Sequence, residues 1–116
     1  MKQLKIILGL ILLVSSLTKD VYAQQSTSKQ QTLDSKQQAI VAISAFTAKG
    51  DLPSLKIALQ AGLDAELTVN EIKEVLVHLY AYTGFPRCLQ GINTFISVLD
   101  DRKAKGITDK MGKTAS

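Results

Sequence analysis

The sequence predicts an all-α protein, a small bundle of four main helices. Apolar residues recur at spacings of three and four between residues 34 and 101, as on the buried faces of helices. Gly50 separates the first two of these runs, and Gly84 and Pro86 separate the last two. No stretch shows the alternation of apolar and polar residues that a half-buried strand requires. A chain of 116 residues has room for one such domain.

The first 23 residues have the pattern of a signal peptide. Lys2 and Lys5 precede an apolar run over residues 6–17, and small residues lead to a cleavage position after Ala23. Because the apolar run is too short for a comfortable permanent anchor, we expect export, to the periplasm or as a secreted protein, with no stable membrane anchor after cleavage. An uncleaved anchor is the alternative interpretation.

Charge and cysteine content exclude several functions. About half of the net charge of +4 belongs to the leader, so we expect no nucleic-acid partner. The basic residues Arg102, Lys103 and Lys105 cluster after the last apolar run, which is typical of a solvated helix C-terminus. Cys88 is the only cysteine, which excludes an intrachain disulfide. We expect it to be a small buried residue, although an intermolecular disulfide stays open.

The first helix of the domain follows residues 24–33, a polar segment that we expect to be flexible. Asp34 or Ser35 is suited to cap the helix, and Gly50 is suited to end it. Its sequence is apolar nearly all round, so we expect it to be buried between neighbours.

The second helix begins at the Asp51-Leu52-Pro53 run, since proline is tolerated in a first turn. Its inner side is marked by Leu55, Leu59, Gly62 and Leu63. The short connection to the next helix predicts that the two are adjacent and roughly antiparallel.

The third helix begins at Thr68, which forms a capping-box pattern with Glu71, and ends near Gly84. Its core face consists of Ile72, Val75, Leu76 and Leu79. A second stripe, expected to lie half out of water at the rim of the core, consists of Glu71, Glu74, His78 and Tyr82.

The last helix opens at Pro86, and its apolar positions keep helical spacing through Leu99. Residues 102–116 lose this periodicity, so we expect a flexible tail and a folded domain over residues 34–101.

Glu74 and His78 are the best candidates for proton transfer. They are four residues apart on one helix, so their side chains can touch, and partial burial moves both pKa values toward neutrality. A solvated surface pair is the plainer interpretation of this spacing. The chain has one histidine, which excludes a histidine-rich metal site, and we expect neither a metal nor a cofactor.

The same helix resembles a known family. The run EIKEVL from Glu71, followed by His78, Tyr82 and the Gly84-Phe85-Pro86 turn, is similar to the signature of the carboxymuconolactone decarboxylase family, E-I-x-E-x-x followed by H-x-x-x-Y-x-G-[FW]-P. The resemblance extends upstream to Leu33 and downstream to about Asp100. It implies the alkylhydroperoxidase D-like helical fold and assembly as a homo-oligomer.

The resemblance also implies a chemistry, which is cofactor-free decarboxylation of a small carboxylated lactone or 3-oxo acid. Loss of carbon dioxide leaves electron density on carbon, so the site needs a proton source and a group that stabilises an enolate. His78 would donate the proton, Glu74 would orient it, and Tyr82 would donate a hydrogen bond. Arg87 and Glu71 are the candidate substrate-binding residues, with Arg87 pairing with the substrate carboxylate.

The sequence departs from the family pattern at two positions. Ala58 stands where many decarboxylating relatives carry a histidine. Glu66 stands where relatives often have glycine, and we expect this difference to affect the turn before the third helix.

Two alternative functions remain. One is an antioxidant role, but relatives that act as antioxidants use a C-x-x-C pair, which this chain lacks. The remaining alternative is a non-catalytic, exported, oligomeric binding module.

Overall fold

The computed structural model describes residues 2–11 and 32–115. The chain divides into two units, Met1–Thr32 and Leu33–Ser116. In the first unit, residues 2–11 form a helix, and the rest of the expected signal peptide lies outside the described residues, as does most of the polar segment 24–33. None of the described helices combines the length and apolarity needed to cross a bilayer.

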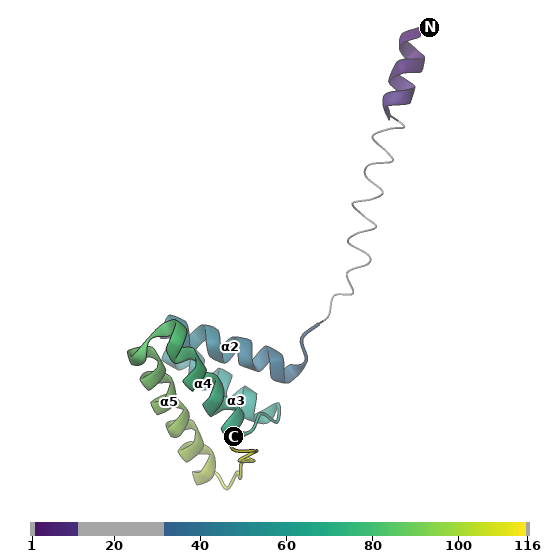
Figure 1. Ribbon diagram of the computed structural model, residues 1–116. Coiled ribbons are helices and arrows are strands. Elements are labelled where there is room, and N and C mark those ends of the chain that lie inside the picture. The colour runs from purple at the N-terminus through teal and green to yellow at the C-terminus, as the bar shows by residue number, and fades with distance from the viewer. Residues whose placement is uncertain (1, 12–31, 116) are drawn as a thin grey trace. The chain divides into compact units, whose positions relative to one another are not determined.

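The second unit confirms the predicted all-α bundle, with four main helices over the described part of the unit (Figure 1). They are α2 (Ser35–Lys49), α3 (Leu52–Asp64), α4 (Val69–Thr83) and α5 (Phe85–Ala104). Helix α2 packs against the other three, and α5 packs against both α3 and α4. The large side chains buried at their meeting point are Ile43, Leu55, Leu59, Ile72, Leu76 and Val98.

The helix boundaries follow from local chemistry that the sequence predicts. Asp34 caps α2 by accepting a hydrogen bond from the Gln37 N–H at 2.8 Å. Gly50 ends the helix in the left-handed conformation, with φ at 75°. Asp51 caps α3 by accepting from the Ser54 N–H and hydroxyl, and these bonds lower the pKa of the Asp51 carboxyl.

Helix α2 packs between α3, α4 and α5, as expected, but only one of its sides is buried. Ala39, Ile43 and Thr47 face its three neighbours, whereas Val41 on the other side is 56% exposed. The other helices of this unit therefore leave the side chain of Val41 uncovered.

Glu66 carries the turn between α3 and α4 in a strained conformation. With φ at 71°, it is the one non-glycine residue at positive φ in the described part of the chain. The turn is closed by hydrogen bonds from the Glu66 N–H to the Leu63 oxygen and from the Leu67 N–H to the Gly62 oxygen. For residues other than glycine this conformation costs about 1 kcal/mol. This agrees with the expectation that the residue at position 66 affects the turn.

The expectation of a flexible tail from residue 102 is wrong for residues 102–112. Residues 102–104 belong to α5, and the segment that follows folds back along the start of α4 (Figure 1). The N–H groups of Val69 and Asn70 donate to the carbonyl oxygens of Lys110 and Met111 at 2.9 and 3.0 Å. The side-chain amide of Asn70 donates to the Gly112 oxygen at 3.1 Å. N–H groups in the first turn of a helix have no partner within it, and here the tail supplies one.

Arg102 holds this segment in place. The sequence pattern had indicated a solvated helix end, and for Arg102 this is wrong. The residue is only 9% exposed. Its guanidinium donates to both oxygens of Asp109 and, through Nη1, to Asp64 at 2.9 Å. The hydrogen bonds that Arg102 donates to Asp109 raise the pKa of Arg102, and their effect outweighs that of burial, which lowers it. Its neighbours Lys103 and Lys105 are exposed, as expected.

Candidate functional site

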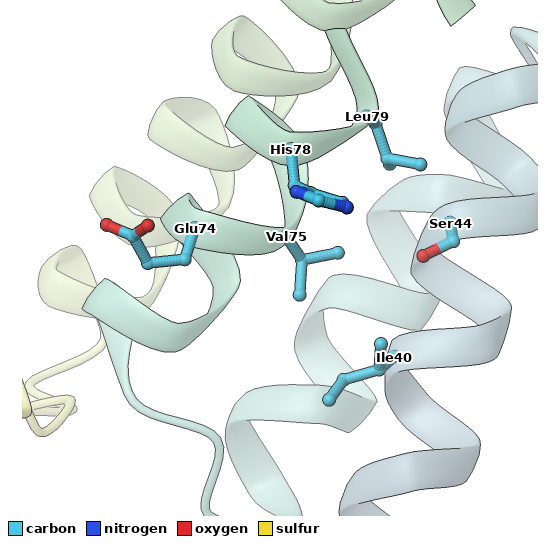
Figure 2. Close-up of a pocket in the computed structure, with 6 residues that line it drawn as sticks. All are labelled: Ile40, Ser44, Glu74, Val75, His78 and Leu79. Atoms are coloured by element: carbon cyan, nitrogen blue, oxygen red, sulfur yellow. The ribbon is translucent and has the colours of Figure 1, made fainter. Parts of the chain in front are cut away.

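A cleft of about 350 Å³ lies between α2 and α4 (Figure 2). Its volume is near the lower end of the range for small-molecule sites. The lining is mostly apolar and comes from both helices: Ile40 and Ser44 from α2, and Glu74, Val75, His78 and Leu79 from α4.

His78 is the central polar group of this cleft. Val75 and Leu79 pack toward α2, and this places His78, one turn from Val75, at the rim. Figure 2 shows the imidazole pointing into the space between the helices. The residue is exposed, and its ring makes no hydrogen bond or ion pair with any residue that the structure describes. The imidazole nitrogens are therefore accessible to a ligand.

Glu74 lines the edge of the cleft, but its carboxylate points away from His78 (Figure 2). Within residues 32–115 no ion pair joins the two side chains. Glu74 is exposed, and an exposed carboxylate gains little from pairing because water solvates it well. No contact between Glu74 and His78 in this structure therefore supports the predicted orienting role of Glu74.

Tyr82 continues the stripe beyond the cleft. Its ring lies beside that of His78, with centroids 5.5 Å apart and planes at 47°. Tyr82 is 76% exposed, so the expectation of half burial at the rim is wrong for this residue. It contacts the imidazole without lining the cleft.

The two candidate substrate-binding residues lie elsewhere. The Glu71 carboxylate accepts a hydrogen bond from the Thr68 N–H at 2.7 Å, which completes the predicted capping box and lowers the pKa of Glu71. The Arg87 guanidinium lies against Gly50, over the turn between α2 and α3. Neither side chain lines the cleft, so their role in binding stays a prediction.

Cys88 and Ala58 are buried, away from the cleft. The Cys88 thiol donates a hydrogen bond to the Leu76 oxygen at 3.2 Å, and its side chain is 6% exposed, which confirms the expectation of a small buried residue. Ala58 belongs to the core and is 6% exposed. A histidine at this position would replace a methyl group inside the bundle.

Sequence reasoning missed Ser44. The one available signal is that Ile40 and Ser44 are four residues apart, so that a hydroxyl follows an apolar residue on one face of α2. That this face lies opposite His78 depends on how α2 packs on α4, which spacing alone does not give.

Comparison with known proteins gives one match. The family model described as the carboxymuconolactone decarboxylase family matches residues 19–95. The matched range covers α2, α3 and α4 and the first half of α5, including every residue that lines the cleft. No curated protein matches the chain, and no solved structure matches it.

Proposed function

Because the chain belongs to the carboxymuconolactone decarboxylase family, we propose that it is a cofactor-free lyase that removes carbon dioxide from a small 3-oxo acid or carboxylated lactone. The observation that carries this proposal is the position of His78, whose imidazole points into a small cleft with an apolar lining. The chemistry needs a proton donor beside the reacting carbon, and the imidazole supplies one at a cleft whose walls are mostly apolar.

In this mechanism the protonated imidazole of His78 supplies the proton that replaces the carboxylate. The bond between the α-carbon and the carboxylate breaks, and its electron pair forms an enolate with the neighbouring carbonyl. The enolate carbon then takes the proton from His78, and water returns one to the imidazole. Ile40, Val75 and Leu79 form an apolar wall against which the substrate chain packs.

The test is turnover by the purified protein. We expect carbon dioxide release from at least one member of a panel of short 3-oxo acids and carboxylated lactones, without added metal or cofactor. The control is the same panel with heat-denatured protein, which corrects for spontaneous decarboxylation. Rates equal to this control for every compound would contradict the proposed function.

A non-catalytic binding module is the second candidate, and one observation favours it. The carboxylate of Glu74 points away from His78, so the pair that would hold a catalytic imidazole in place is not formed. A binding module would take up the same compounds in the cleft and leave them unchanged. An antioxidant role is disfavoured, because the single thiol, Cys88, is buried.

We also propose that the protein acts as a homo-oligomer. Along α4 and α5, five large apolar side chains are between 42% and 60% exposed: Val77, Tyr80, Phe85, Leu89 and Ile96. The rings of Tyr80 and Phe85 contact each other edge to face across the turn between the helices. Single apolar residues are common on surfaces, but a group of this size is typical of an interface. We expect sedimentation equilibrium to give a mass of two or more chains, and a monomer mass would contradict this proposal.

A further inference from the structure

The hydroxyl of Ser44 differs from those of the helical threonines. Thr47, Thr83 and Thr94 each donate to the carbonyl oxygen four residues earlier in their own helix, at 2.7 to 2.9 Å. Hydroxyl groups inside helices commonly find this local partner. Ser44 Oγ makes no such bond and has no hydrogen-bond partner among residues 32–115. Its hydrogen-bonding capacity is therefore available to the cleft.

Ser44 and His78 face the cleft from opposite sides. Figure 2 shows the Ser44 oxygen directed from α2 into the space that the imidazole enters from α4. Ser44 is half-buried, whereas His78 is exposed. Two polar groups that converge on an apolar cleft are what fixes the orientation of a small ligand.

We infer that Ser44 is a substrate-binding residue, whose hydroxyl donates a hydrogen bond to the carbonyl oxygen of the 3-oxo acid or lactone. This inference rests on the proposed function. When the carbon–carbon bond to the carboxylate breaks, the electron pair moves toward that oxygen, and a donor already aimed at it stabilises the enolate. His78 then delivers its proton to the carbon, and the carboxylate leaves as carbon dioxide.

The position of Ser44 also defines the class of substrate. A hydroxyl and an imidazole can orient one carbonyl oxygen and the adjacent carbon, and the apolar wall holds a short aliphatic or lactone body. Arg87, the predicted partner of the carboxylate, lies over Gly50 and outside the cleft. No lysine or arginine lines the cleft, so the carboxylate lies against the apolar wall, and this favours its loss, because the charge is more dispersed in the transition state than in the bound acid.

The test uses the full chain and a stable probe, 4-oxopentanoate. Its ketone is one carbon further from the carboxylate than in a 3-oxo acid, so loss of carbon dioxide would not give an enolate and the probe does not decarboxylate by this route. Titration followed by amide NMR is expected to shift the signals of Ser44, Val75 and His78. Ser44→Ala is expected to raise the Kd of the probe about tenfold, which is the effect of losing one good hydrogen bond. Alanine is a strong helix former, so the substitution keeps the helix intact. The matched control is Ser97→Ala, an exposed serine on α5 outside the cleft, with an unchanged Kd.

The same variants separate this inference from the proposed function. If wild-type protein binds the probe in the cleft and Ser44→Ala weakens that binding, but no compound of the panel is decarboxylated, the inference stands and the catalytic proposal fails. If a panel compound is turned over and Ser44→Ala keeps wild-type kcat, KM and Kd, the inference fails and catalysis stands. An absence of probe binding to wild-type protein, or shifts confined to other surfaces, also overturns the inference.

Discussion

Replacing His78 with alanine is expected to lower kcat for decarboxylation by about 10²–10⁴-fold, the range that a positioned acid or base contributes. The imidazole is the one group in the cleft that carries a transferable proton to the substrate carbon, since Ser44 is a weak acid and the Glu74 carboxylate points away. His78 is exposed, and its ring makes no hydrogen bond or ion pair with the described residues, so the free energy of unfolding should change by only about 0.5 kcal/mol. Carbon dioxide release and urea unfolding, measured on the same preparation, check both parts.

Two further measurements sharpen this prediction. Lys73→Ala is the matched control, because Lys73 is exposed on the same helix and does not line the cleft, and we expect wild-type kcat. Added imidazole should restore part of the activity of His78→Ala, since the cleft is open to solvent and the missing ring leaves space for it. A folded His78→Ala protein with wild-type kcat would remove His78 from the mechanism.

The helices and their boundaries were predictable because the signals are local. The capping box joins Thr68 and Glu71, which are three residues apart, and both of its hydrogen bonds form. Gly50 ends α2 because its left-handed conformation costs glycine little. Apolar spacing identified Leu55, Leu59, Ile72 and Leu76, which are all fully buried. Each of these features depends on residues within one or two helical turns.

The C-terminal segment was not predictable in this way, because its partners are distant in sequence. Asn70 and Gly112 are 42 residues apart, and Arg102 and Asp64 are 38 apart. Residues 105–112 have no apolar periodicity, so composition alone indicates a disordered tail. The backbone hydrogen bonds that hold this segment leave no trace in side-chain identity, since any residue supplies a carbonyl oxygen.

The sequence predicted which polar residues share one side of α4, but it did not predict which residues they contact. Helical spacing places Glu74 and His78 on one side of α4, but it does not set the rotamers, which direct the two groups apart. Ser44 comes from another helix, and only the packing of α2 against α4 brings it to the cleft. The prediction for Arg87 relied on its nearness to the motif in sequence, whereas the start of α5 directs this side chain toward Gly50.

Replacing Arg102 with alanine is expected to lower the free energy of unfolding by about 3 kcal/mol, the lower end of the range for breaking a buried ion pair. The side chain of Asp109 is only 10% exposed and would keep its charge without a partner. We do not expect the upper end of the range, because the other partner of Arg102, Asp64, is 69% exposed and stays solvated without it. Urea unfolding of wild-type and variant protein measures the difference.

The loss of stability in Arg102→Ala should also affect the start of α4, because Arg102 holds the segment whose carbonyl oxygens accept hydrogen bonds from the Val69 and Asn70 N–H groups. In Arg102→Ala, these two amides should exchange hydrogen faster relative to the core amide of Leu76. The matched control is Lys103→Ala, an exposed neighbour, with a change of about 0.5 kcal/mol or less. Combining Arg102→Ala with Asp109→Ala should cost less than the sum of the two changes, by about 0.5–3 kcal/mol, because the second removes the stranded carboxylate. Additive losses, or equal stability of the Arg102 and Lys103 variants, would show that the ion pair does not fasten this segment.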